Sequence, residues 1–506
     1  MHFQHLSKIA LAISVAFLSA GASAESNQVY SETVSGHNAP MTVDVIMKDG
    51  AIKNILVDDR ESPGAGKKAI AILKKQILEN QTVNLDAVTG ATITSSSFVS
   101  AVSANLKKSG VDLKKFSKEI PAKELNDKYE SQVVIIGGGG AGLAAAASAI
   151  EAGGNVIIIE KLGFLGGSSA VSGGGFAYTN WLETFIRAYP KQVQIFTDTT
   201  AEKLIEDKSG RVIGVEAEHN GKKVTFTAQK GVIITTGGFA SNVELRQKLN
   251  TGPWKEKVLD SSIGSTNSFR ASQGDGLKLA KDVGADLIDL DYIQLHPGGT
   301  PGTGIMSSWP SGRNRIFVNV DGARFVNEDA PRDELCKAIF AQPQSKYWVV
   351  MNKMRLPNKD TVIGGMAIGE LLQLGKAYKA DTIEGLAKVT GMKADKLKAS
   401  IDMYNEVVTG KVKKDRFGFT KSMASDAPFT EGPYFATMLV PAVHHTMGGI
   451  RINVKTQVLD ANGKIIPGLY AAGEVTGGVH GDNRVGGNGI ADAMVFGKRA
   501  GQEAMK

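Results

Sequence analysis

The chain has 506 residues, 59 of them glycine, with a formal net charge of +7 at pH 7 and a sequence pI of about 9.1. This length suffices for two or three domains with large cores, and the scattered lysines indicate a solvated basic surface, not a nucleic-acid site. The single cysteine, Cys336, excludes an intramolecular disulfide, a cysteine-rich metal site, an iron–sulfur cluster and a Cys-x-x-Cys-His haem attachment. Any electrons must therefore travel on organic cofactors, and no metal is expected.

The first 24 residues have the pattern of a secretory signal. Lys8 supplies the positive start, residues 9–18 form a short apolar segment, and Ala22-Ser23-Ala24 is a small-residue cleavage site. The apolar segment is too short to cross a bilayer, and no later stretch is long enough. We therefore expect export, most simply to a bacterial periplasm, and no membrane span.

Residues 25–111 predict a small α+β unit. Residues 41–47 and 52–57 alternate like strands, and residues 67–78 have helical periodicity. A turn rich in hydroxyl side chains, residues 86–95, then precedes an apolar helix over residues 98–106. Residues 112–130 are rich in lysine and indicate a linker.

A complete βαβ unit follows the linker. Residues 133–136 predict a buried strand, Gly137-x-Gly139-x-x-Gly142 opens a helix, and residues 155–159 predict a second strand that ends in Glu160. This spacing is the dinucleotide fingerprint, in which the pyrophosphate lies at the helix N-terminus and the acidic residue accepts the ribose hydroxyls.

Further strands and glycine-rich turns extend this unit into a Rossmann-like domain. A turn at Gly166-Gly167-Ser168, another at residues 173–175, a hairpin over residues 212–228 and a strand that ends near Gly237 follow Glu160. A strand-like segment that ends in Glu474 and a helix over residues 489–505 lie near the C-terminus. We expect one domain built from residues 131–290 and 445–506, with residues 291–444 inserted as a cap.

Few side chains in this half of the chain can bind an anion and deliver a proton. They are His296, Arg332, the pair His444-His445 and Arg484, each in a loop-like context that mostly contains glycine or proline. Any one of them alone is better explained as a structural residue. Together, interleaved with cofactor-binding turns, they predict a carboxylate site.

Asp86-x-x-Thr89-Gly90-Ala91-Thr92 resembles the covalent flavinylation motif of FMN-binding domains. This resemblance implies that a flavin transferase joins the FMN phosphate to Thr92. The alternative is that the motif only caps the following helix.

The remaining motifs resemble FAD-dependent oxidoreductases of the fumarate reductase and succinate dehydrogenase superfamily, and within it the periplasmic fumarate and urocanate reductases. The resemblance implies an α/β and α+β fold: a small FMN-binding domain, then a Rossmann-like FAD-binding domain with an inserted α+β capping domain. It implies that Arg484 clamps a substrate carboxylate, that His296 and His444 hold and polarise it, and that Arg332 donates a proton while FAD delivers a hydride to a C=C bond. The residues it assigns to cofactor binding are Thr92, Gly137, Gly139, Gly142, Glu160, Lys161, Gly166, Gly167, Ser168, Gly237, Asp275, His445, Glu474, Gly487 and Ile490.

The same resemblance implies a role in anaerobic respiration, with an unsaturated acid of the urocanate, fumarate or acrylate type as terminal electron acceptor. A membrane quinol-oxidising cytochrome would donate electrons, and covalent FMN would relay them to FAD.

The chain departs from the family pattern at two places. Leu295 and Trp309 stand where urocanate reductases place a tyrosine and an aspartate, and serines in residues 305–311 replace a proton relay of haem-containing relatives. Leu295 and Trp309 would suit a bulkier, less polar acid. Several tens of residues that the family pattern contains are also missing near Asn180-Trp181. Two other functions therefore stay open: a non-catalytic flavin electron carrier with a truncated FAD domain, and a dehydrogenase of the same superfamily that runs towards desaturation.

Overall fold

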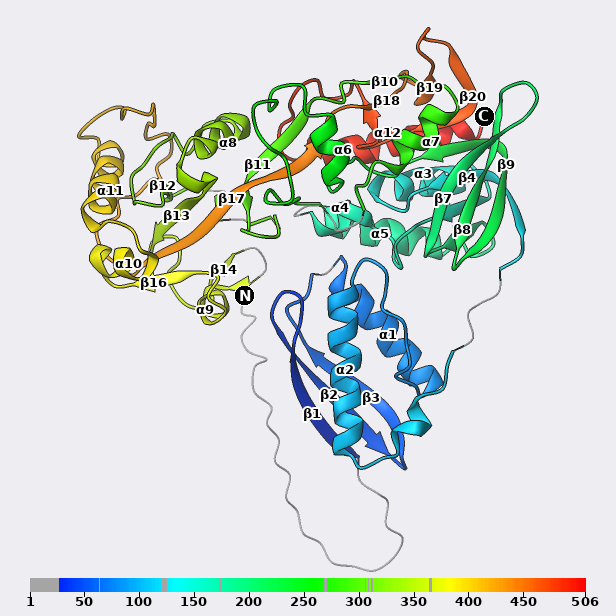
Figure 1. Ribbon diagram of the computed structural model, residues 1–506, viewed down its shortest axis with the longest axis horizontal. Coiled ribbons are helices and arrows are strands. Elements are labelled where there is room, and N and C mark those ends of the chain that lie inside the picture. The colour runs from blue at the N-terminus through cyan, green and yellow to red at the C-terminus, as the bar shows by residue number, and fades with distance from the viewer. Residues whose placement is uncertain are drawn as a thin grey trace, which may run out of the picture.

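The computed structural model describes residues 27–506 except 63, 121–124, 173–174, 268–270, 305, 308, 311–312 and 364–365. The expected signal segment, residues 1–24, lies outside the described residues, as do two glycines of the 173–175 turn. Figure 1 shows three parts: an N-terminal α+β unit, a mixed α/β part and a cap.

The N-terminal unit is a three-stranded antiparallel sheet packed against two helices. The strands are β1 (Gln28–Ser35), β2 (Pro40–Lys48) and β3 (Ala51–Asp58), and the helices are α1 (Gly66–Asn80) and α2 (Thr92–Lys108). Every second residue of β2 is buried, because alternate side chains of a strand point to the same face. Those side chains meet Leu73, Ile77 and Phe98 of the helices in one apolar cluster. The sequence pattern predicted both later strands and both helices but not β1.

A short 3₁₀-helix, η1 (Leu113–Phe116), leads from this unit towards the next. Phe116 is buried in the core of the N-terminal unit, and Leu125 packs into the core of the following part. The first strand of that part, β4 (Lys128–Ile136), already begins within residues 112–130.

The predicted βαβ unit forms as β4, α3 (Gly140–Glu151) and β5 (Val156–Ile159). These two strands lie side by side in a sheet ordered β19-β20-β9-β4-β5-β6, in which all neighbours from β20 to β6 are parallel. The other strands of this sheet are β6 (Val193–Phe196), β7 (Thr199–Glu206), β8 (Val212–His219), β9 (Lys222–Ile234), β19 (Gln457–Leu459) and β20 (Ile465–Ala471). The hairpin strand and the following buried strand predicted in residues 223–236 are one continuous strand, β9.

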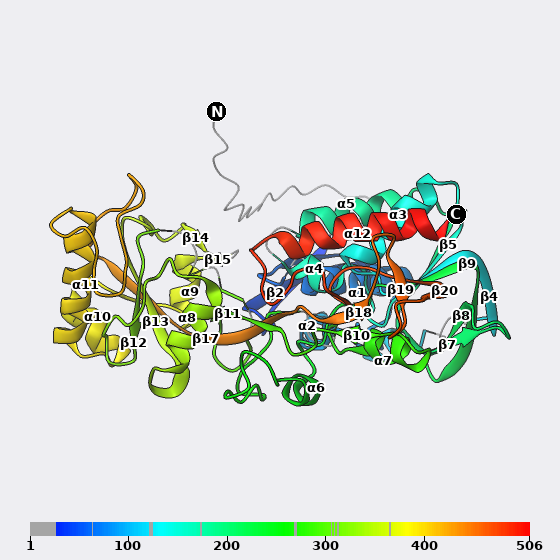
Figure 2. The same ribbon diagram turned by 90° about the horizontal axis from the view of Figure 1, so that it is seen from above.

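One face of this sheet is covered by α3, α5 (Gly175–Arg187) and α12 (Asn488–Ala504), which lie side by side in Figure 2. Glycines bring α12 close to α3: a methyl group at Gly497 or Gly501 would collide with a carbonyl oxygen of α3. Helix α5 continues without interruption through Asn180 and Trp181. The remaining elements of this part are α4 (Gly167–Val171), α6 (Val243–Lys248), α7 (Asp275–Asp282), β10 (Leu287–Ile288), β18 (Gly449–Arg451) and β21 (Thr476–Gly477).

The cap is attached through two neighbouring antiparallel strands, β11 (Ile293–Gly299) and β17 (Tyr434–Thr446), which lead the chain out of the mixed α/β part and back. Its sheet has the order β11-β17-β13-β12, and β16 also pairs with β17. The other cap elements are β12 (Ile316–Asn319), α8 (Arg332–Phe340), η2 (Pro343–Ser345), β13 (Tyr347–Asn352), β14 (Val362–Ile363), β15 (Met366–Ala367), α9 (Ile368–Gln373), β16 (Tyr378–Ala380), α10 (Ile383–Thr390) and α11 (Ala394–Val408). Among the described residues, no helix is both long and apolar enough to pass through a bilayer.

Candidate active site

A single cavity of about 510 Å³ connects the dinucleotide fingerprint with the anion-binding candidates. It opens beyond the carboxyl ends of the parallel strands β4, β5 and β9, which is where open α/β sheets bind ligands. Most of the residues that the sequence assigned to cofactor binding line it: Gly137, Gly139, Glu160, Lys161, Gly167, Ser168, Gly237, Asp275, His445, Glu474, Gly487 and Ile490.

The glycine loop brings the N-terminus of α3 to this cavity. Gly137 has φ +101°, a conformation that favours glycine, and a side chain at Gly142 would collide with the carbonyl of Gly137. Gly142 and Gly166 do not line the cavity but shape its wall: the amide of Gly166 donates to the carbonyl of Gly138 at 2.8 Å. The free amides of the first helical turn therefore face a site for an anionic group such as a pyrophosphate.

Glu160 closes the nucleotide end of the cavity. Its carboxylate accepts hydrogen bonds from the amides of Gly138 (2.7 Å) and Leu162 (2.8 Å). Burial raises the pKa of this carboxyl, although both hydrogen bonds act in the opposite direction. Lys161 and Asp275, also on the cavity wall, form an ion pair with each other.

Two arginines from distant segments lie at the other end of the cavity. Arg332 is the first residue of α8, and Arg484 lies in the loop before α12. Arg332 Nη1 and Arg484 Nε are buried and have no hydrogen-bond partner, and neither guanidinium forms an ion pair within the described part of the chain. Glu474, also on the cavity wall, acts on Arg484 through its charge without forming an ion pair. Because partly buried cations normally pair with an anion, this end of the cavity can accept a further negative group.

The two candidate histidines belong to the strands that connect the cap. His444, on β17, lines the cavity, while His296, on β11, does not line it but packs against His444 with ring centroids 5.1 Å apart. Burial and the neighbouring positive charges lower the pKa of His296 to about 3 and that of His444 to about 2. Both rings are therefore neutral at pH 7.

The hydrogen bonds of these rings identify one tautomer. The amide of Gly298 donates to Nδ1 of His296 at 2.9 Å, so Nδ1 is unprotonated and Nε2 carries the proton. His444 Nδ1 lies 2.6 Å from the hydroxyl of Thr266, which can donate or accept. His296 can thus donate a hydrogen bond through Nε2 without adding charge.

The loop that carries Arg484 is fixed by two elements of the cap, β11 and α8. Gln294 of β11 donates to the carbonyl of Arg484 at 2.9 Å, and Asn483 donates to Asp333 of α8 at 3.3 Å. A methyl group at Gly486 would lie 2.9 Å from Arg332 Nη2, so glycine at this position leaves room for that guanidinium. Sequence reasoning missed Gln294, although it points to the same side of β11 as His296.

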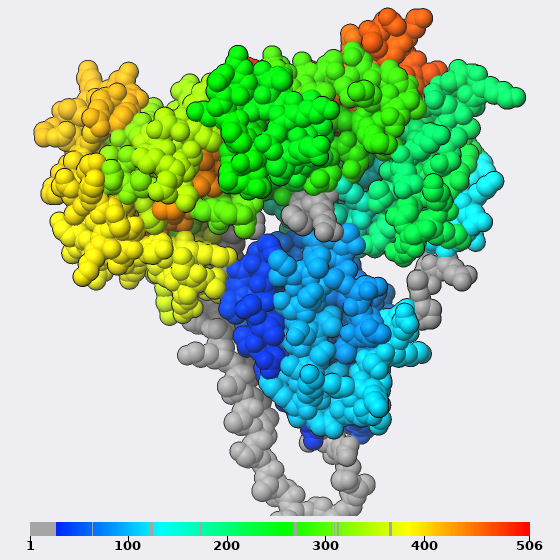
Figure 3. All heavy atoms as spheres, viewed as in Figure 1, coloured from blue at the N-terminus to red at the C-terminus, as the bar shows by residue number. Residues whose placement is uncertain are grey.

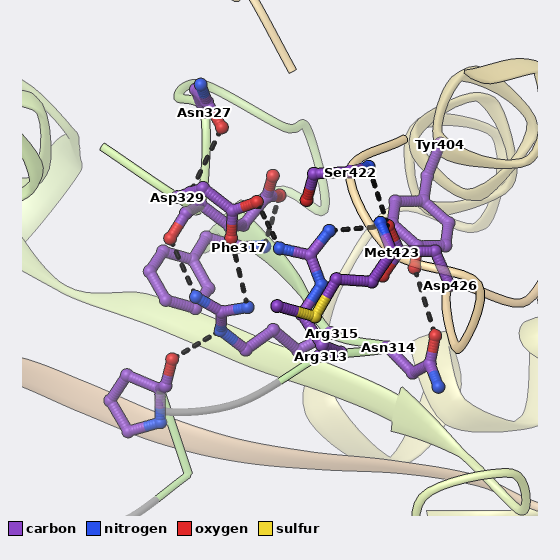
Figure 4. A network of polar contacts seen from close by, with 12 residues as sticks. Arg313, Asn314, Arg315, Phe317, Asn327, Asp329, Tyr404, Ser422, Met423 and Asp426 are labelled. Atoms are coloured by element: carbon purple, nitrogen blue, oxygen red, sulfur yellow. Dashed lines mark hydrogen bonds and ion pairs between the residues drawn. The ribbon is translucent and has the colours of Figure 1, made fainter. Parts of the chain in front are cut away.

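A second polar network anchors the segment that leads to Arg332. Arg313 binds both oxygens of Asp426 at 2.6 Å each and also pairs with Asp329, three residues before Arg332. Arg315 lies 3.5 Å from the other oxygen of Asp329. Figure 4 shows Asp329 between the two guanidinium groups. Bidentate contacts of this kind restrict geometry, so the start of α8 is held in place.

Leu295 and Trp309, expected to suit a bulky acid, do not line the cavity. Leu295 is 1% exposed and packs in the core of the parallel sheet, while Trp309 is 4% exposed in a cluster of the cap. The strand alternation explains Leu295, because its neighbours Gln294 and His296 take the face towards the site. Asn267 and Met306, which the sequence did not suggest, line the cavity instead.

Glu474 and His445 lie on the cavity wall between its two ends. Glu474 accepts a hydrogen bond from the amide of Thr446 at 3.1 Å, and burial raises its pKa to about 7. His445 is buried, which lowers its pKa well below the usual value, and its Nδ1 has no partner. A ligand with polar edges, such as an isoalloxazine and its ribityl chain, would satisfy these groups.

Thr92, the candidate for FMN attachment, is the first residue of α2. Its side chain is exposed and makes no hydrogen bond with the described residues. Thr94, in the same helical turn, is 3% exposed and donates to the buried Glu61 at 2.9 Å. Of these two threonines, only Thr92 presents a free hydroxyl. No cluster of three metal-binding side chains occurs in the described part of the chain.

The parallel sheet, the fingerprint and the cavity define a dinucleotide-binding protein of the Rossmann-like class. Comparison with known families is specific: the chain belongs to the family of proteins with an FAD binding domain, whose model matches residues 132–184 and 179–490. The model of the FMN-binding domain matches residues 36–107.

Proteins with assigned activities resemble this chain over most of its length. A urocanate reductase from Eggerthella lenta is 32% identical over 576 aligned positions, which cover 96% of this chain and 93% of the relative. A probable fumarate reductase, Ifc3, from Shewanella frigidimarina is 38% identical over 60% of this chain, and the match spans only 49% of that relative. An open conformation of a flavocytochrome c3 fumarate reductase superposes with a TM-score of 0.61 at 29% identity, covering 74% of this chain and 78% of the other.

These comparisons also bear on the shortened segment. The 576 aligned positions exceed the 506 residues of this chain, so at least 70 positions (576 − 506) align a gap in this chain with the relative. The two pieces of the FAD family match meet at residues 179–184. Both findings agree with a shortening near Asn180-Trp181, which the continuous helix α5 now spans.

Proposed function

We propose that this protein reduces the C=C bond of an α,β-unsaturated carboxylate of the urocanate, fumarate or acrylate type. The observation that carries this proposal is the pair of half-buried guanidiniums, Arg332 and Arg484, at one end of a dinucleotide cavity. Each has one buried nitrogen without a hydrogen-bond partner, and neither forms an ion pair among the described residues. A substrate carboxylate would supply the missing negative charge. The urocanate and fumarate reductases among the relatives support the same reaction class.

Each residue of the anion end has a task in this reaction. Arg484 binds the carboxylate through its planar, two-pronged donor geometry. His444, on the cavity wall, is placed to donate a hydrogen bond that stabilises the charge developing on the carboxylate and the α carbon. His296, neutral and protonated at Nε2, packs against His444 with ring centroids 5.1 Å apart and holds that ring. The cavity residues from Gly137 to Ile490 would hold FAD, which when reduced would supply a hydride for the β carbon. Arg332 then donates a proton to the α carbon, and burial favours this step because it lowers the pKa of the guanidinium.

We further propose covalent FMN on Thr92, attached by a flavin transferase, as the relay that receives electrons from outside the protein. The exposed, unbonded hydroxyl of Thr92 and the match to the FMN-binding domain support this assignment. The signal-like N-terminus and the relatives described as fumarate reductase (cytochrome) support a periplasmic location and a quinol-oxidising cytochrome as donor.

The shortening near Asn180-Trp181 favours one alternative, a flavin carrier without catalytic activity. Trp181 is 63% exposed, and Val485 and Val495, in and next to α12, are 74% and 62% exposed. Trp181 lies at the shortening itself, so part of the apolar surface there is uncovered, although none of the three side chains lines the cavity. In the carrier, FMN would be bound but the unsaturated acid would not be reduced.

Anaerobic reoxidation of the dithionite-reduced protein separates the two functions. Fumarate, urocanate, acrylate, methacrylate and cinnamate are tested in turn, with Arg332→Ala as the catalytic variant and the exposed Arg499→Ala as the matched control. The reductase predicts rapid reoxidation by at least one acid, lost in Arg332→Ala and kept in the control. Covalent FMN without reoxidation by any acid would instead identify the carrier.

A further inference from the structure

The N-terminal FMN-binding unit has its hydrophobic core completed by the FAD-binding part. Leu162 and Phe164 lie in the loop after Glu160 and are only 1% and 4% exposed. Both belong to the same apolar cluster as Val88 and Phe98 of the FMN-binding unit. A freely tethered domain would leave these two side chains in water, so their burial indicates a fixed seat.

The flavinylation motif itself lies on this seat. The amide of Gly163 donates to the carbonyl of Thr89 at 3.1 Å. A methyl group at Gly90 would lie 3.1 to 3.4 Å from Leu162 and Phe164. The motif that ends in Thr92 therefore rests on the loop that directly follows Glu160, a residue of the cavity wall.

An ion pair beside the motif joins the same two parts. Lys68 Nζ, on α1, donates to the carbonyl of Leu165 at 2.8 Å and pairs with Glu183 of α5 at 2.6 Å. The two side chains are 18% and 19% exposed, so this pair is better shielded from water than the typical surface pair. The neighbouring Lys67 is 51% exposed, and its ion pair, with Asp59 at 3.6 Å, stays within the FMN-binding unit.

The FMN-binding unit also holds the cap. Arg60 Nε donates to Glu370 of α9 at 2.7 Å, and Lys376 Nζ donates to the carbonyl of Asn38 at 2.7 Å. In Figure 3 the FMN-binding unit (blue) lies against both the cap (yellow) and the FAD-binding part (green). One small domain therefore bridges the two parts between which the cavity lies.

We propose that the FMN-binding domain is a fixed brace: Leu162, Phe164 and the Lys68–Glu183 pair seat it on the FAD-binding domain, and the Arg60–Glu370 pair holds the cap to it. The functional meaning of this inference rests on the proposed attachment of FMN to Thr92. The brace keeps Thr92 beside the nucleotide loop, so the distance between the two cofactor sites does not depend on the linker. Release of the brace loosens the cap at the same time.

Hydrogen exchange on the full-length protein with both flavins bound tests the brace directly. The variants are Lys68→Met with Lys67→Met as its matched control, and Glu370→Gln with the exposed Glu384→Gln of α10 as its control. Loss of one charge-assisted hydrogen bond predicts about tenfold faster exchange in segments 86–92 and 162–166 for Lys68→Met. Glu370→Gln should speed exchange in α9 and increase the radius of gyration in solution scattering, while both controls stay at the wild-type values.

Two results would overturn the brace: unprotected exchange of segment 162–166 in the wild type, or equal exchange in Lys68→Met and Lys67→Met. Phe164→Ser gives an independent check, because it weakens the apolar contact between the two domains without removing a charge and should also speed exchange in segment 162–166. Covalent FMN content and reoxidation by the acid panel are measured on the same samples. If covalent FMN and reoxidation are absent while hydrogen exchange follows the pattern expected for the brace, the proposed function is refuted and the brace stands.

Discussion

Replacement of Arg484 by lysine tests the proposed carboxylate clamp most directly. The guanidinium lies against Gly489, where an added methyl group would be 3.2 Å from Cζ, and its Nε is buried without a partner. Lysine keeps the charge but loses the second of two parallel N–H donors. A hydrogen bond between charged groups contributes about 1.5–3 kcal/mol, so Arg484→Lys should weaken acid binding about 10- to 150-fold.

The assay uses oxidised protein, in which the acid binds without being reduced. The Kd of the acid that is active in the reoxidation panel is obtained from the change in flavin absorbance on titration. Arg499→Lys, on the helix α12 that follows the Arg484 loop and 44% exposed, is the matched control and should bind as the wild type does. A Kd for Arg484→Lys within threefold of the wild-type value would refute the clamp and place the carboxylate elsewhere.

Three further predictions concern cofactor attachment, pH and packing. Thr92→Ala should remove covalent FMN, which intact-protein mass spectrometry would show as the loss of the mass of one FMN. The control Ser96→Ala, one turn along the same helix, should keep the FMN. FMN that is retained in Thr92→Ala would place the attachment site elsewhere. The folded-state pKa of Glu474, about 7, exceeds its usual 4.5, so this carboxyl contributes stability below pH 4.5 that is lost as pH rises to 7. Glu474→Gln should therefore stabilise the cofactor-free protein more at pH 8 than at pH 5, measured as the difference in Tm from wild type, and an equal difference at both pH values would contradict the burial argument. Gly501→Ala should lower the free energy of unfolding by about 1–3 kcal/mol, because the added methyl group meets the α3 backbone, and the variant should release FAD at a lower urea concentration than the wild type. Gln502→Ala is the control. Equal urea midpoints for Gly501→Ala and the wild type would show that the helices can separate.

The sequence predicted the features that depend on local spacing. The βαβ unit around Gly137 and the acidic residue Glu160 stand within 30 residues of each other, so strand, turn and helix signals reinforce one another there. The strand β1 was missed because its residues alternate between exposed and half-buried positions and carry little apolar signal. The sequence predicted two strands in place of the long strand β9, because the charged Lys230 interrupts the apolar pattern.

The arrangement of the site depended on contacts that no local pattern encodes. Arg332 and Arg484 are 152 positions apart (484 − 332) and reach one cavity only because β11 and β17 return the chain to the sheet. Leu162 and Phe164 follow the fingerprint closely in sequence but pack in another domain, which apolar character alone does not indicate. Leu295 was wrongly predicted to lie at the site because it is the sequence neighbour of His296. In the strand its side chain points to the opposite face and packs in the core.

The close packing of α12 on α3 has a consequence for the order of synthesis. The nucleotide loop ends at Glu160, and α12, which completes the cavity, begins 328 residues later at Asn488 (488 − 160). At about 5–20 residues per second, the ribosome needs roughly 15 to 65 s to make the intervening chain. During that time the alanine-rich α3 lacks its partner helix and exposes an apolar face. The cavity wall that α12 contributes, including Ile490 and Ala493, is therefore the last part of the site to be made.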